Sequence, residues 1–127
     1  MRRLWAAAAL IAVLAGLSAL HVLALDRITN RMAGQLEQAR QALIQEDWDG
    51  AQVLIEDAYQ DWEAHDFYLH VTLRHTDIDA VRSSFHEAIA YLSSREDSGE
   101  CAAVCARLVN QLELILEGEL PTLKNLL

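Results

Sequence analysis

Apolar residues fill the beginning of the chain and afterwards recur only at helical spacing. The run from Leu4 to Leu25 is apolar apart from Ser18, His21 and one glycine, and it contains no acidic residue. Arg2 and Arg3 precede it. As a helix this run would extend roughly 33 Å, which matches the hydrocarbon core of a bilayer. The pattern therefore predicts a membrane-spanning helix.

A cleaved signal peptide begins in the same way, and Val22-Leu23-Ala24 offers small residues for cleavage. Two features favour an uncleaved signal-anchor. The run is longer than a usual signal core, and an amphipathic pattern continues out of it without a turn. The apolar positions of that pattern are Leu25, Ile28, Met32, Leu36, Ala39 and Leu43. We therefore expect an anchor at residues 1–25 and an acidic helical domain at residues 26–127.

The orientation of the anchor depends on its flanking cations. Arg27 and Arg31 nearly balance Arg2 and Arg3 across the run. The short tail that holds both N-terminal arginines favours the cytoplasm. We expect a single-pass protein of the cell membrane, with its N-terminus in the cytoplasm and its domain outside.

The domain is expected to be all-α, because apolar positions recur every three or four residues and never alternate. The helix that leaves the membrane is expected to end near Gln45. Asp47 is a plausible N-cap for a second helix, which ends near His65. The segment from Phe67 to Leu73 predicts a short helix or a buried connection.

Turn signals divide the second half of the domain. Thr76, followed three residues later by Asp79, approximates a capping box, so a helix is expected behind it. Asp97-Ser98-Gly99 separates this helix from the last one, which Gly118 and Pro121 are expected to stop. The stripes expected to form the core are Ala51, Leu54, Ile55, Ala58, Tyr59 and Trp62; Ile78, Val81, Phe85, Ala88, Ile89 and Leu92; and Cys101, Ala102, Cys105, Leu108, Val109, Leu112, Ile115 and Leu116.

A weak internal repeat relates the two halves. A shift of 50 residues pairs Glu46-Asp47 with Glu96-Asp97. The same shift places the stripe Ala51, Leu54, Ile55, Ala58, Tyr59 and Trp62 on Cys101, Val104, Cys105, Leu108, Val109 and Leu112. Upstream, the same shift pairs Ile28 with Ile78, Ala39 with Ile89, and Ala42 with Leu92. The repeat predicts two antiparallel helical hairpins packed together, since one hairpin alone leaves its apolar face wet. Chance similarity between amphipathic helices is the alternative explanation.

The first turn resembles the helix-turn-helix pattern of tetratricopeptide-like hairpins. Its spacing is Ala39-x3-Leu43-x4-Trp48-x2-Ala51-x2-Leu54-x3-Ala58. In such hairpins a small residue lets two helices approach closely. The resemblance implies a four-helix, tetratricopeptide-like domain.

The whole chain resembles a family of small, uncharacterised, membrane-anchored helical proteins from Clostridia-like Firmicutes. The likeness rests on Arg3-Leu4-Trp5, Asp47-Trp48-x2-Ala51, Trp62-Glu63-x-His65, His75-x-Asp77-Ile78-Asp79 and Pro121-Thr122-Leu123-Lys124-Asn125-Leu126-Leu127. That family is a domain of unknown function, so the resemblance implies a fold and a location but no catalytic residues. Its members are often encoded beside a multi-pass membrane protein, which implies a membrane partner.

The charge of the domain limits its partners. Without Arg2 and Arg3, 8 basic residues face 19 acidic ones. Such a surface repels nucleic-acid phosphates and anionic headgroups, so we expect no nucleic-acid partner. The acidic residues from Glu46 to Asp66 have no basic residue among them. They are expected to form a solvated face, with a docking surface for a basic protein as the alternative.

Cysteine and histidine are the candidate ligands. Cys101 and Cys105 share one helix face, where small apolar residues are expected, so core packing is favoured over a metal or redox site. His65, His70 and His75 would point to different sides of a continuous helix. We expect His65 to close a helix C-terminus and assign none of the three to a metal.

No catalytic, cofactor-binding or metal-binding residue is assigned, because no nucleophile elbow, phosphate loop or metal-hydrolase motif is recognised. An enzyme would need a cleft that gathers His75, Asp77 and Asp79. We expect a membrane-tethered interaction or scaffold module that is not an enzyme, has no cofactor and binds an integral membrane protein. The alternative is an extracytoplasmic sensor of a small ligand or lipid, in which the segment from Phe67 to Leu73 lines a cavity.

Overall fold

The structure, a computed structural model, describes the backbone of residues 1–126 and the side chains of residues 1–119. Its helices are α1 (Arg2–Ile44), α2 (Trp48–Ala64), α3 (Asp66–Thr72), α4 (His75–Ser94) and α5 (Ser98–Leu126). No strand occurs in this part of the chain. The expectation of an all-α fold is confirmed.

The first helix, α1, is unbroken over its 43 residues. From Arg2 to Leu14 all of its residues are exposed, whereas one face is buried from Leu25 onward. Among the described helices, α1 is the one that is long and apolar enough to cross a membrane. The expected continuity between the apolar run and the first domain helix is confirmed.

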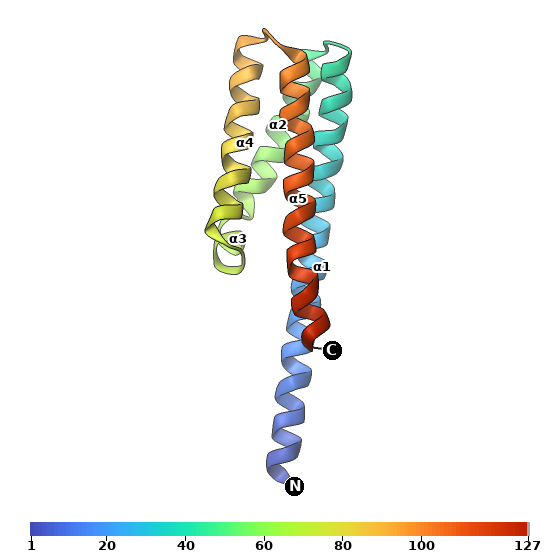
Figure 1. The fold of residues 1–127 in the computed structure, drawn as a ribbon, viewed down its shortest axis with the longest axis vertical. Coiled ribbons are helices and arrows are strands. Elements are labelled where there is room, and N and C mark those ends of the chain that lie inside the picture. The colour runs from blue at the N-terminus through green and yellow to red at the C-terminus, as the bar shows by residue number, and fades with distance from the viewer. Residues whose placement is uncertain (127) are drawn as a thin grey trace.

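The four long helices alternate in direction along the chain (Figure 1). Helix α1 packs against α2 and α5, and α4 packs against α5 and α2. The short helix α3 contacts α2 and α4 and lies at the end of the domain nearest to the N-terminus. Beyond that end, only α1 and the last part of α5 continue (Figure 1).

The core is built from the predicted stripes. Trp62 and Phe85 lie at its centre, with ring centroids 6.3 Å apart. Thr29 is buried as well, and its hydroxyl donates to the carbonyl of Leu25 at 2.8 Å. Six of the expected positions lie at the edge of the core and are only partly buried: Ile28, Leu54, Tyr59, Ile89, Val109 and Leu116. The remaining positions of the four stripes are buried.

The connections α1–α2 and α4–α5 share two features, a left-handed residue and an aspartate that caps the next helix, but the spacing between the two differs. Each contains one residue in the left-handed region, Glu46 (φ 59°) or Arg95 (φ 51°). The Asp47 carboxylate accepts a hydrogen bond from the Gly50 amide at 3.0 Å, which confirms Asp47 as the N-cap of α2. Asp97 accepts from the Glu100 amide in the same way. Asp47 follows its left-handed residue directly, but Glu96 intervenes before Asp97.

This extra residue changes the internal register. A shift of 50 residues relates the buried positions of α2 and α5, as the sequence predicts. The shift that relates α1 to α4 is 49 residues, so the predicted upstream pairs are wrong by one position. The buried equivalents are Thr29 with Ile78, Ala39 with Ala88, and Leu43 with Leu92.

Two predicted helix boundaries are wrong. Helix α4 begins at His75, and the Arg74 carbonyl accepts from the amides of Asp77 and Ile78 at 3.2 Å. Arg74 is the N-cap residue and its side chain has no acceptor atom, so the helix start has no side-chain cap. Thr76 therefore lies inside the first turn instead of capping it. Helix α5 does not stop at Gly118 or Pro121 but continues to Leu126.

The continuation of α5 has a physical reason in its neighbour. Glycine and proline cost about 1 and 3 kcal/mol in a helix interior. Helix α5 packs antiparallel along α1, a tertiary contact that stabilises the helix and that the local sequence does not reveal.

Candidate functional site

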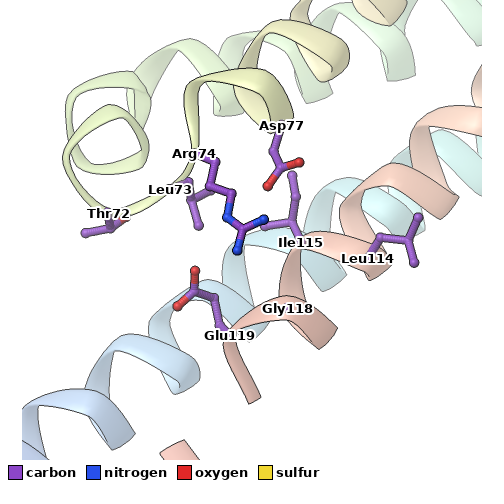
Figure 2. Close-up of a pocket in the computed structure, with 8 residues that line it drawn as sticks. All are labelled: Thr72, Leu73, Arg74, Asp77, Leu114, Ile115, Gly118 and Glu119. Carbon is purple, nitrogen blue, oxygen red and sulfur yellow. The ribbon is translucent and has the colours of Figure 1, made fainter. Parts of the chain in front are cut away.

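A cleft of about 560 Å³ opens where the α3–α4 connection faces the second half of α5 (Figure 2). Its lining residues are Thr72, Leu73, Arg74, Asp77, Leu114, Ile115, Gly118 and Glu119. The Arg74 side chain extends into the space between α4 and α5, with Asp77 on one side and Glu119 on the other (Figure 2). One cation and two carboxylates thus line the cleft together with the apolar side chains of Leu73, Leu114 and Ile115.

The local backbone explains why the cleft is open. Leu73 (φ −113°, ψ 166°) and Arg74 (φ −71°, ψ 138°) are extended, so α3 and α4 are separated by a short straight segment. On the facing helix, a Cβ built on Gly118 would meet nothing within 4 Å. Of the lining side chains, Ile115 is buried and Leu73 is partly buried, whereas Arg74 and Asp77 are exposed.

Beside the cleft, three side chains tie α1, α3 and α5 together. His21 Nδ1 shares a hydrogen bond with the Tyr68 hydroxyl, and His21 Nε2 lies 3.3 Å from Glu119 Oε2. The rings of His21 and Tyr68 have centroids 5.6 Å apart. One neutral tautomer satisfies both contacts, with Tyr68 donating to Nδ1 and Nε2–H donating to Glu119. We call these three residues the His21 clamp.

The chemistry of the His21 clamp suits a structural contact better than catalysis. A hydroxyl, an imidazole and a carboxylate stand in the order of a nucleophilic triad. However, burial, with a smaller effect of the Glu119 charge, raises the pKa of the Tyr68 hydroxyl. An activated nucleophile needs the opposite shift. The arrangement therefore holds three helices at fixed positions.

The two cysteines lie in the core as predicted. Both are free and fully buried, and Cys101 Sγ lies 3.8 Å from the Ala88 carbonyl oxygen. The neighbouring Cys101 thiol and burial raise the pKa of the Cys105 thiol. The hydrogen bond with Cys105 lowers the pKa of the Cys101 thiol, against the effect of burial. The raised pKa disfavours the reactive thiolate at Cys105, and burial keeps solutes away from both thiols.

Of the three spaced histidines, His65 lies between α2 and α3, His70 lies in α3 and His75 begins α4. His65 ends α2, and its Nδ1 lies 2.8 Å from the Asp61 carbonyl oxygen, which confirms it at a helix C-terminus. His70 makes the same contact with Asp66 at 2.9 Å. The rings of His70 and His75 are 5.9 Å apart. Within the described part of the chain, no group of three or more His, Cys, Asp or Glu residues has a geometry that could hold a metal ion.

Of the acidic residues from Glu46 to Asp66, Asp61 and Asp66 are partly buried and the others are exposed, and several of them contact arginines of other segments. Asp49 lies 2.7 Å from Arg95, and Asp66 lies 2.7 Å from Arg82. The cleft does not gather the triplet that an enzyme would need. Of His75, Asp77 and Asp79, only Asp77 lines it.

Sequence reasoning missed the His21 clamp. His21 and Tyr68 are 47 positions apart, and Tyr68 and Glu119 are 51 positions apart. No sequence-spacing pattern connects residues at such distances. The one available signal was His21 itself, an ionisable residue inside an apolar run. Such residues are rare in membrane segments and usually have a partner.

No curated protein and no solved structure matches the chain. A family model described as Domain of unknown function (DUF4363) matches residues 19–126. The match begins inside the apolar run and includes the cleft and the His21 clamp. Because it covers most of the sequence, the chain belongs to the family described as Domain of unknown function (DUF4363).

Proposed function

We propose that this protein is a membrane-tethered interaction module that packs against an integral membrane protein and has no catalytic activity of its own. The observation that carries the proposal is the continuity of α1. One helix supplies both the exposed apolar segment and a face of the domain core. Any contact that the apolar segment makes inside the bilayer is therefore coupled rigidly to the domain.

The exposed segment offers a surface for such a contact. Its large apolar side chains are between 44% and 75% exposed from Leu4 to Leu23: Leu4, Trp5, Leu10, Ile11, Val13, Leu14, Leu17, Leu20 and Leu23. Between them lie small residues, including Gly16 and a run of alanines. Small residues let transmembrane helices approach closely, which is how such helices associate in lipid.

The orientation remains part of the proposal. We place the N-terminus in the cytoplasm and the domain outside, because Arg2 and Arg3 precede the apolar run and positive charge favours the cytoplasmic side.

We also propose that the domain consists of two related antiparallel hairpins, α1–α2 and α4–α5, each tetratricopeptide-like as a unit. The matched left-handed residues and aspartate caps support this relation. Ala39 and Ala88 occupy equivalent buried positions, where a small residue allows close helix approach.

An anchor exchange tests the interaction. Residues 4–16 are replaced by an unrelated apolar helix of equal length. The exchange stops there because Leu17, Leu20, His21 and Ala24 form a pocket with Tyr68, and replacing them would disturb the fold. A parallel exchange on the domain surface, Val53→Ala, serves as the control because Val53 is exposed on α2.

We expect the anchor exchange to abolish co-purification of the membrane partner from native membranes, while the helical circular dichroism and thermal midpoint stay unchanged. The Val53→Ala variant should retain the partner. Retention of the partner by the exchanged protein would show that the anchor merely tethers the domain. Recovery of no reproducible membrane protein with the natural chain would overturn the proposal.

The cleft favours a second candidate, a sensor of a small ligand or lipid. Its volume falls within the range of small-molecule sites, although most such sites are more apolar. Of the segment from Phe67 to Leu73, which is expected to line a cavity, only Thr72 and Leu73 line this cleft. Native mass spectrometry of the full chain should then detect a bound molecule that is lost in an Arg74→Ala variant. Spectra of the apo mass alone would count against the sensor.

A further inference from the structure

We propose that α3 is a second membrane contact, which places Phe67 and Val71 in the bilayer surface and seats the domain against it. This inference rests on the proposed membrane-spanning role of α1. It concerns a different segment and a different partner, the lipid itself.

The outward face of α3 is unusually apolar for a domain surface. Phe67 is 83% exposed and Val71 is 69% exposed, more than any other large apolar side chain described beyond the end of α1. They are four positions apart, so they lie on the same face of the helix. At about 100° per residue, Leu69 points to the opposite side, where it is buried in the core. Phe67 and Val71 therefore point away from the domain.

The level of α3 along α1 coincides with the end of the apolar run. Tyr68 and Thr72 line a shallow pocket together with Leu17, Leu20, His21 and Ala24 of α1. Counting from Leu4, the roughly 20 residues that cross a bilayer reach about Leu23. The pocket residues thus lie at the upper boundary of the hydrocarbon, and α3 lies at the same level.

The direction of the exposed face agrees with this level. Helix α3 closes the end of α2 and α4 that is nearest to the N-terminus (Figure 1). Its core side, which carries Leu69, faces the bundle, so the side with Phe67 and Val71 faces away from it. Among α2, α3 and α4, the α3 end lies nearest to a bilayer around the anchor, and the last part of α5 runs beyond it along α1.

Aromatic residues mark both boundaries of the same layer. Trp5 follows the N-terminal arginines, and Tyr68 contacts His21 at the other end. Trp5 and His21 are 16 positions apart, or about 24 Å along the helix. Tryptophan and tyrosine concentrate at the two membrane–water interfaces. The charged groups around α3, such as Asp66 and Arg74, would then lie among the headgroups.

Lipid is the occupant that this geometry selects, because the same anchor that holds the domain already brings the bilayer to the level of α3. The test uses the full chain in phosphatidylcholine vesicles, with a fluorescent label that is quenched by brominated acyl chains. Single cysteines replace Phe67 or Val71 in a Cys101→Ala, Cys105→Ala background. Control labels replace Leu10 in the anchor and Val53 on α2, both of which are 60% exposed.

We expect brominated lipid to quench the labels at positions 10, 67 and 71, and to leave the label at position 53 unchanged. Quenching at position 10 but not at positions 67 and 71 would overturn the inference and leave the anchor intact. Absence of quenching at position 10 would overturn both. If the labels at positions 67 and 71 are protected from solvent in native membranes but not in pure lipid vesicles, a protein and not the bilayer covers this face of α3.

A measurement without variants guards against misfolding of the labelled chains. Hydrogen exchange of residues 66–72 in the natural protein should slow by several-fold on transfer from detergent to vesicles, relative to residues 48–64. Equal exchange of α3 in both settings would also overturn the inference.

Discussion

The hydroxyl of Tyr68 offers the most selective perturbation of the His21 clamp. Replacing Tyr68 with Phe removes the hydrogen bond to His21 Nδ1 and keeps the ring that packs 5.6 Å from the imidazole. The contact between His21 and Glu119 at 3.3 Å is left in place. The variant therefore isolates one link between α3 and α1.

The size of the effect follows from the environment of the bond. A hydrogen bond in a protein contributes about 1 kcal/mol net. His21 and Glu119 side chains are 21% and 25% exposed, so water only partly replaces the lost partner. A loss of about 1 kcal/mol in the local stability of α3 corresponds to roughly fivefold faster hydrogen exchange, since about 1.4 kcal/mol is a factor of ten.

The assay is hydrogen exchange of the full chain in lipid, read on a peptide that covers α3. Tyr91→Phe is the matched control, because Tyr91 is also partly buried and its hydroxyl makes no hydrogen bond within the described part of the chain. We expect faster exchange in α3 for Tyr68→Phe only. Equal behaviour of the two variants would refute the reasoning that the hydroxyl holds α3 against the anchor.

The pKa of Tyr68 adds a dependence on pH. Because its pKa is raised in the folded protein, the contribution of the neutral hydroxyl is fully present below the ordinary tyrosine value of about 10. It is lost as pH rises through the higher folded-state value. Protection of α3 should therefore fall at alkaline pH in the natural protein, and the fall should be smaller in Tyr68→Phe.

Two further predictions concern the core and the helix starts. Replacing Cys101 and Cys105 together with Ala should cost roughly 1–2 kcal/mol in chemical denaturation, with no change in metal content, and both native thiols should resist alkylation at pH 8 until the chain unfolds. Rapid alkylation of the folded protein, or stoichiometric zinc that the double variant loses, would contradict their buried, structural role. Gly99→Ala should raise stability by about 0.5–1 kcal/mol, whereas Gly50→Ala should not, because a new Cβ there would collide with the Asp47 carboxylate that caps α2. The thermal midpoints of the two variants test this prediction. An equal rise for Gly50→Ala and Gly99→Ala would show that the Asp47 side chain moves aside without loss of stability.

Properties that depend on nearby residues were predictable from the sequence. The repeat of three and four residues placed Met32, Ile55, Phe85 and Leu108 in the core, and all four are buried. The cap at Asp47 was predictable for the same reason, since a carboxylate and an amide three residues later form it without help from the rest of the fold.

Properties that depend on contacts between distant segments were not predictable. Gly118 favours a helix end locally, but packing of α5 along α1 carries the helix through it. Because Glu96 is an extra residue in the α4–α5 connection, α4 matches α1 at a shift of 49 residues instead of 50. The apolar pattern alone is compatible with both alignments. The His21 clamp arises only when α1, α3 and α5 are already assembled.

The central claim is that one face of the exposed part of α1 recognises a membrane protein while the same helix continues into the domain core. Site-specific photo-crosslinking at successive positions from Leu4 to Leu17, in native membranes, tests it most directly. We predict that one membrane protein is captured with a period of three to four positions, since a helix presents one face to a partner. Capture that is equal at all positions, or no reproducible protein at any of them, would contradict the claim.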